Sequence, residues 1–136
     1  MKENEKPRKP PKGDDLAERL LDFAVRVGKV ADALPDTRLG RHIAGQLVRC
    51  GTSPAPNYEE ARAAESRADV VHKMRICLKE LRETHCWLRM CARGGLLPES
   101  QLLPLINEGK QLCDIFGKSI VTANQGTTRK KPNDNR

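Results

Sequence analysis

One stretch of this chain, residues 70–91, repeats apolar or small residues at alternating steps of four and three. These positions are Val70, Met74, Cys77, Leu81, Thr84, Leu88 and Cys91. An α-helix makes one turn every ~3.6 residues, so the spacing puts all of them on one side of a long helix. A helix with a continuous apolar side buries it against helices that run nearly parallel to it. The pattern therefore predicts a helical bundle.

The first segment with the same spacing predicts a helix from Asp14 to Leu34. Its inward residues are Leu16, Leu20, Phe23, Val27, Val30 and Leu34. Pro35 has no backbone N–H and disfavours helical geometry in the residue before it. We therefore expect the helix to end there.

The second predicted helix begins near Asp36 or Thr37 and carries a kink. Its inward residues are Leu39, Ile43, Leu47 and Cys50. Pro54 and Pro56 remove two backbone donors, so we expect a break between Gly51 and Pro56. The helix is predicted to resume over residues 57–64.

Two further long helices complete the predicted architecture. The third starts at Ser66, with Asp69 three residues later, and stops at Gly94-Gly95. The fourth begins near Pro98 and runs to about Ala123, and its inward residues are Leu102, Ile106, Gly109, Cys113, Phe116, Ile120 and Ala123. Short connections between long helices make neighbours antiparallel. The predicted fold class is all-α, an antiparallel up-down four-helix bundle over residues 14–124.

The positive charge of the chain is concentrated at its ends. Of the formal net charge of +7, residues 1–13 supply +3 and residues 125–136 another +3, which leaves +1 for the bundle. Both ends are polar and rich in charge and helix breakers, so we expect disordered basic tails. A basic surface on the bundle must then come from the arrangement of its charges.

The cysteines and the hydropathy bear on the compartment. Five cysteines is an odd number, which does not suit a disulfide framework and favours reduced thiols. No apolar run approaches the ~20 residues of a membrane span, and the N-terminus does not resemble a signal peptide. We expect a cytoplasmic protein with no membrane association.

One outer strip of the third helix carries only positive charge. It contains Arg75, Lys79, Arg82, Arg89 and Arg93. Acidic residues of the helix fall on other sides, so Glu–Lys pairs within the helix do not neutralise the strip. The strip is either a solvated face or a surface that follows a phosphate backbone, and the second interpretation predicts RNA or DNA binding with low sequence specificity.

Large apolar residues also occur outside the inward side of this helix. Ile76, Trp87 and Met90 alternate there with charged residues. Packing against another helix of the bundle explains some of them, and a subunit interface explains the set better. We expect a homo-oligomer.

The sequence does not predict an enzyme or a cofactor site. Asp69 and His72 have the spacing of half a di-iron site, but the second half is missing. The helix places Cys86 on a different side from Cys77 and Cys91, so a zinc site within one subunit is not predicted. We expect no metal, no cofactor and no catalytic residues.

The central block of the sequence resembles a known family. The matching residues are Gly51-Thr52-Ser53, Asn57-Tyr58, Glu60-Ala61, Ser66-Arg67-Ala68, Lys73, Leu78-Lys79-Glu80, Glu83-Thr84 and Trp87-Leu88, with Leu34-Pro35, Gly40, Gln46-Leu47 and Arg49 before them. This pattern is similar to the bacterial four-helix-bundle family of ribosomal-RNA (23S) intervening-sequence proteins, over roughly residues 14–124. Pro54 and Pro56 depart from it, because family members more often carry small or branched residues there.

The resemblance implies an assembly and two kinds of partner. The family forms ring-like homopentamers, and a sibling group comprises the accessory variability proteins of diversity-generating retroelements, which bind RNA and a reverse transcriptase. The recurring polar positions are Asn57, Glu60, Lys73, Glu80 and Glu83, which we interpret as structural. Two functions are left open: a non-enzymatic homo-oligomer that binds RNA or DNA, and a protein-binding scaffold for a partner such as a reverse transcriptase.

Overall fold

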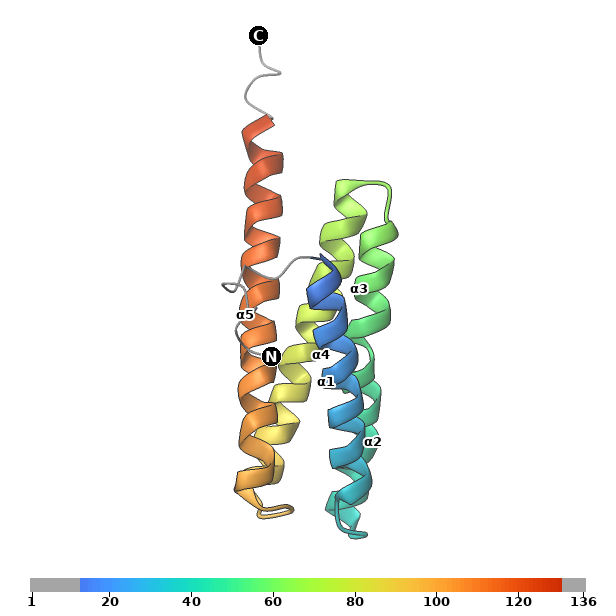
Figure 1. Ribbon diagram of the computed structural model, residues 1–136, viewed down its shortest axis with the longest axis vertical. Helices are drawn as coiled ribbons and strands as arrows, with labels where there is room; N and C mark the ends of the chain where they lie inside the picture. The colour runs from blue at the N-terminus through green and yellow to red at the C-terminus, as the bar shows by residue number, and fades with distance from the viewer. Residues whose placement is uncertain (1–12, 131–136) are drawn as a thin grey trace, which may run out of the picture.

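The structure, a computed structural model, describes the backbone of residues 13–130 and the side chains of residues 13–125. The described residues form α1 (Gly13–Ala33), α2 (Arg38–Thr52), α3 (Pro54–Ala63), α4 (Arg67–Arg93) and α5 (Glu99–Lys130). Helices α2 and α3 are the two halves of one bent helix (Figure 1). With α2 and α3 taken as one bent helix, the four helices run alternately up and down. The predicted antiparallel four-helix bundle is therefore confirmed.

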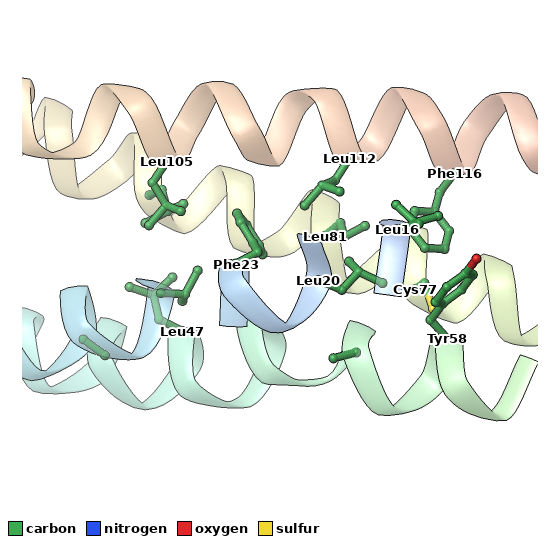
Figure 2. Packing of buried hydrophobic residues seen from close by; sticks show 14 of the residues in the cluster. Leu16, Leu20, Phe23, Leu47, Tyr58, Cys77, Leu81, Leu105, Leu112 and Phe116 are labelled. Carbon is green, nitrogen blue, oxygen red and sulfur yellow. The ribbon is translucent and has the colours of Figure 1, made fainter. Parts of the chain in front are cut away.

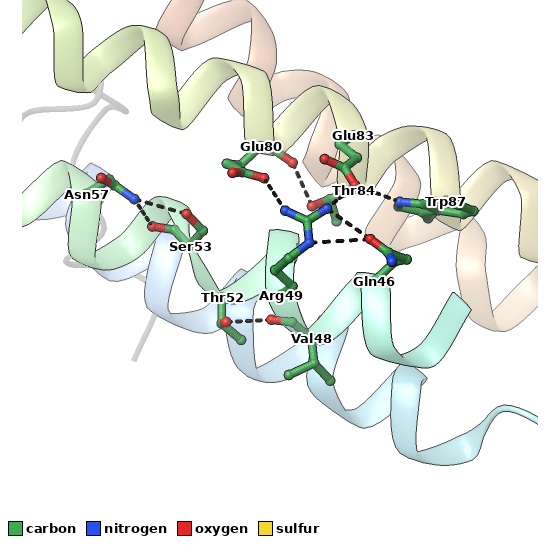
Figure 3. Close-up of polar contacts among 10 residues, drawn as sticks. All are labelled: Gln46, Val48, Arg49, Thr52, Ser53, Asn57, Glu80, Glu83, Thr84 and Trp87. Carbon is green, nitrogen blue, oxygen red and sulfur yellow. Dashed lines mark hydrogen bonds and ion pairs between the residues drawn. The ribbon is translucent and has the colours of Figure 1, made fainter. Parts of the chain in front are cut away.

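The bend lies at Ser53, between α2 and α3. Pro54 and Pro56 occupy the first turn of α3, where no N–H is needed for a bond within the helix. The prediction that the helix resumes at Asn57 is therefore wrong, because α3 already begins at Pro54. The Asn57 side chain donates to the carbonyl (2.9 Å) and the hydroxyl (3.0 Å) of Ser53, which fixes the junction (Figure 3).

The ends of the helices follow their local sequences. The Ser66 hydroxyl accepts from the backbone N–H of Asp69 at 3.1 Å and caps α4, as the sequence predicts. Thr37 caps α2 in the same way, through the N–H of Gly40 at 3.0 Å. At the other end of α4, Gly95 has a φ of 67°, a left-handed conformation that favours glycine.

The core runs along the bundle axis and combines residues from every helix. Phe23, Leu47, Leu81 and Leu112 are among its fully buried side chains (Figure 2). At one end Phe116 of α5 meets Tyr58 of α3 edge to face, with ring centroids 5.6 Å apart. The predicted inward side of α4 is confirmed from Cys77 to Cys91, while Val70 and Met74 are half-buried.

The predicted inward side of α5 is partly wrong. Leu105 and Leu112 are buried, whereas Ile106 and Cys113 are half-buried. The apolar side of α5 is wide enough to include both Leu105 with Leu112 and Ile106 with Cys113. Packing against the neighbouring helices determines which of these two pairs is buried. Ile106 and Cys113 instead lie at the edge of α5 toward α4, where each lines a surface groove.

Two further predictions, on Leu39 and on the end of α5, differ from the structure. Leu39 was expected inward and is 50% exposed, because it lies in the first turn of α2, at the end of the bundle. Helix α5 continues past the predicted end at Ala123 to Lys130. Of the predicted tails, residues 1–12 and 131–136 lie outside the described residues. No helix among those described is both long and apolar enough to cross a membrane.

Candidate nucleic-acid interface

Helix α4 displays the predicted basic strip on its outer side. Arg75, Lys79, Arg82, Arg89 and Arg93 are all exposed. Among the side chains of residues 13–125, no carboxylate forms an ion pair with any of these five. Their charges are therefore available to a ligand from outside the subunit.

Several other basic residues of the bundle are engaged with carboxylates. Arg19 of α1 binds Glu108 of α5 through two hydrogen bonds of 2.8 and 3.0 Å. This bidentate pair, with burial opposing it, raises the pKa of Arg19. Arg62 pairs with Asp14, and Lys73 with Glu60 at 2.5 Å. Arg19, Arg62 and Lys73 therefore hold helices together, whereas the five cations of the strip face outward.

Helix α5 adds positive charge beside the middle of the strip. A groove of about 500 Å³ between α4 and α5 is lined by Arg82, His85, Lys110, Cys113, Asp114, Gly117 and Lys118. The groove contains one carboxylate, that of Asp114, which lies 3.9 Å from the ammonium nitrogen of Lys110. A phosphate-bearing ligand in this groove would meet cations from both helices.

His85 carries less positive charge at neutral pH than an ordinary histidine, because its pKa is lowered. Burial lowers its pKa below the ordinary 6.5, and the positive charges of Arg89 and Lys110 lower it further. The imidazole can still donate or accept one hydrogen bond. The electrostatic attraction of the groove therefore comes mainly from its arginine and lysines.

Toward the start of α4, the strip meets a second groove. It has a volume of about 400 Å³ and is lined by Arg67, Ala68, Val71, His72, Arg75 and Asn124. Its far wall is the C-terminal part of α5, where Arg67 donates to the carbonyl of Ala123 at 3.4 Å. The basic surface therefore follows the α4–α5 seam over most of the length of α4.

The end of the strip belongs to a surface of a different kind. Arg89 and Arg93 border a groove of about 390 Å³ whose other lining residues are Leu39, Cys86, Met90 and Gly94. Leu39 comes from the start of α2, so the groove lies between α2 and α4. Its floor is apolar, unlike that of the α4–α5 groove. Of the five predicted residues, Arg75 and Arg82 line grooves between α4 and α5. Arg89 and Arg93 border this apolar groove and also a groove of about 180 Å³ that contains Glu99, Leu103 and Ile106 of α5.

The three residues predicted for a subunit interface have different environments. Trp87 is half-buried, donates to Glu83 at 3.0 Å and meets the ring of His42 edge to face at 5.7 Å. Contacts inside the subunit therefore explain Trp87. Ile76 is half-buried, and Met90 is 42% exposed in the α2–α4 groove.

The recurring polar residues join helices to one another. Arg49 of α2 reaches Glu80 at 3.2 Å and also pairs with Glu83, both on α4 (Figure 3). The Lys73–Glu60 pair links α4 to α3, and Asn57 holds the bend. Each of these residues has a partner inside the subunit, which is what a structural role requires.

The described residues contain no group of three or more His, Cys, Asp or Glu side chains that could hold a metal ion. The cysteines Cys50, Cys77 and Cys91 are buried in the core. Burial raises the pKa of each, and that of Cys77 reaches about 12. Cys77 also donates weakly to the carbonyl of Pro54 at 3.5 Å. These thiols fill space in the core.

Cys77 should accordingly react very slowly with iodoacetamide in the folded protein. The thiolate is the nucleophile, and a rise in pKa from 9.0 to about 12 lowers its fraction at pH 8 by roughly a thousandfold. Peptide mass spectrometry after timed alkylation measures the rate, with urea-unfolded protein as the control. Labelling of Cys77 as fast as in the unfolded chain would contradict the packing around it.

Comparisons with known proteins agree with this architecture. The model of the family described as 23S rRNA-intervening sequence protein matches residues 15–118. The chain is also similar to a protein of unknown function from the S23 ribosomal protein family of Bacteroides thetaiotaomicron, known from a crystal structure. The two are 30% identical, with a TM-score of 0.74 over 81% of this chain and 98% of the other. No curated protein matches the sequence.

Proposed function

This chain belongs to the 23S rRNA-intervening sequence protein family, and from that premise we propose that it is a non-enzymatic homo-oligomer that binds RNA or DNA electrostatically. The observation that carries the proposal is the set of exposed cations along the α4–α5 seam. Arg75, Lys79 and Arg82 form one side of it, and Lys110 and Lys118 the other.

The proposed binding mode follows from the chemistry of the seam. Lysine and arginine side chains that neutralise phosphates release counterions, which favours binding and makes it sensitive to salt. The aromatic residues Tyr58 and Phe116 pack against each other in the core, so they offer no platform for base stacking. Contacts of this kind carry little sequence information. An oligomer would repeat the seam on each copy, and the copies would bind one long nucleic acid together.

A binding titration tests the proposal. We expect the protein to bind a fluorescent 30-nucleotide RNA in an anisotropy assay, with an affinity that falls steeply between about 50 and 200 mM salt. The variant R75Q/K79Q/R82Q should bind roughly a hundredfold more weakly at about 50 mM salt, because it loses three phosphate contacts. The slope of log affinity against log salt should flatten by about 2.

The matched control removes the same charge from another surface. Arg26, Lys29 and Arg38 are also exposed, and they lie on α1 and at the start of α2. The variant R26Q/K29Q/R38Q should bind almost as well as the parent protein. An equal loss in both variants would mean that net charge, rather than the seam, controls binding. Absence of binding at 50 mM salt would contradict the proposed function.

The apolar α2–α4 groove favours a second candidate, a scaffold whose main partner is a protein such as a reverse transcriptase. Leu39 and Met90 provide the kind of exposed apolar surface that protein partners cover. A protein that copurifies through nuclease treatment and 1 M salt, together with failure of the RNA titration, would favour this alternative.

A further inference from the structure

Helix α1 has a second apolar side, which faces away from the core. Leu21 is 48% exposed and Val25 is 59% exposed. Together with Glu18 and Gly28 they follow steps of three, four and three, so they lie on one side of the helix. We name Glu18, Leu21, Asp22, Val25 and Gly28 the α1 face. Nothing in the described subunit covers its two apolar residues.

Gly28 has no role in the packing of the subunit itself. A Cβ atom built at this position meets no other atom within 4 Å. Glycine in the middle of a helix destabilises it relative to alanine, so the fold alone would favour alanine here. A small residue beside Leu21 and Val25 does allow the backbone of another molecule to approach closely.

The first half of the α1 face is acidic. Asp15, Glu18 and Asp22 are exposed, and among the described side chains none forms an ion pair with them. The basic residue between them, Arg19, is bound to Glu108. The exposed basic residues of α1, Arg26 and Lys29, come only after Val25.

The α2–α4 groove has the complementary chemistry. Its apolar residues Leu39 and Met90 are 50% and 42% exposed, and Arg89 and Arg93 stand beside them. An apolar patch with acidic neighbours on α1 therefore matches an apolar groove with basic neighbours on α2 and α4. The two surfaces belong to different parts of the same subunit, so one copy cannot use them on itself in the observed fold.

We propose that the α1 face of one copy docks into the α2–α4 groove of a second copy. This inference rests on the proposed function for the existence of an oligomer, and it adds the surfaces that build it. Such a contact is head-to-tail, because each copy contributes a different surface and keeps one of each free for further copies. Repetition gives a closed ring or an open filament. Arg75, Lys79 and Arg82 lie outside the contact and stay free for nucleic acid.

Two double variants test the contact. The face variant is L21E/V25E and the groove variant is L39E/M90E, and all four positions are exposed enough to accept glutamate without disturbing the core. Light scattering should give the parent protein a mass that is a multiple of 15.2 kDa, and each variant alone the monomer mass. The control V121E/T122E, at two exposed positions of α5, should assemble like the parent protein. Circular dichroism checks that every variant is helical.

Mixing the two variants distinguishes a head-to-tail contact from a symmetric one. The intact groove of the face variant should bind the intact α1 face of the groove variant, so an equimolar mixture should form a dimer near twice 15.2 kDa and nothing larger. Cys86 lines the groove and provides a second readout. Its alkylation should be at least tenfold slower in the assembled parent protein than in the face variant.

Exchanging the charges of the α1 face and the α2–α4 groove provides an independent test of the contact. The variants E18K/D22K and R89E/R93E should each weaken assembly, and combining all four changes in one chain should restore it. A parent protein of 15.2 kDa at 100 µM, full assembly by the face variant, or a mixture that remains monomeric would each overturn the proposal. Mass and RNA affinity are measured separately, so a parent protein that assembles without binding RNA would contradict the proposed function and support the contact.

Discussion

Replacement of Phe23 by alanine should lower the free energy of unfolding by about 3–5 kcal/mol. Phe23 is 0% exposed and lies near the middle of the core (Figure 2). Removing its ring takes away buried apolar surface and leaves a cavity that rigid neighbouring helices cannot fill completely. Urea unfolding followed by circular dichroism measures the change.

Phe23 also matters for how α5 joins the bundle. An added Cβ at Gly109 of α5 would lie 3.4 Å from the ring carbon Cζ of Phe23, so the two helices meet at this point. Arg19 of α1 also hydrogen-bonds to Glu108 and Gln111 of α5. We therefore expect F23A to loosen α5 more than α4, which hydrogen exchange of the two helices would show.

The control for this prediction lies two residues away on the same helix. Val25 is 59% exposed, and V25A should change the stability of the subunit by no more than about 0.5 kcal/mol. It is measured at a protein concentration low enough to keep the subunit monomeric, because Val25 belongs to the α1 face. A loss below about 1 kcal/mol for F23A would contradict the central position of its ring.

The sequence predicted the buried residues well in helices where one series of apolar residues, spaced by three and four, stands out. In α4 periodicity selects the buried line from Cys77 to Cys91, and in α1 it selects Leu16, Leu20, Phe23 and Val27, although Leu21 and Val25 of α1 are apolar and exposed. Helix α5 is different, because Leu105-Ile106 and Leu112-Cys113 are adjacent apolar pairs. Which member of each pair is buried depends on the neighbouring helices, and that information is not local.

The candidate site was predictable in part for the same reason. Arg75, Lys79 and Arg82 share a side of one helix, so their grouping follows from the helical period. Lys110 and Lys118 join them only because α5 packs beside α4 in a particular register. Trp87 shows the converse: its aromatic partner is His42 of α2, which sequence spacing within α4 cannot reveal. Side chains that meet across two helices require the tertiary structure.

Gly40 presents the second large expected effect, through the backbone rather than the core. A Cβ atom at this position would lie 2.0 Å from the carbonyl oxygen of Pro35, far inside van der Waals contact. Gly40→Ala must therefore displace the connection between α1 and α2 or the start of α2. The proline ring fixes φ at Pro35, which limits how the connection can relax. We expect a loss of about 2–3 kcal/mol of stability.

The same substitution one and a half turns later in α2 should have the opposite sign. Gly45 is exposed, and an added Cβ there meets no atom within 4 Å. Gly45→Ala should stabilise the protein by about 0.5–1 kcal/mol, because alanine loses less conformational freedom in a helix than glycine does. Urea midpoints of the two variants, measured side by side, isolate the effect of the Pro35 carbonyl from helix propensity. If Gly40→Ala also stabilised the protein, the connection at residues 34–37 could not be as close to α2 as the structure places it, and the cap from Thr37 to Gly40 would have to be replaced by a looser turn.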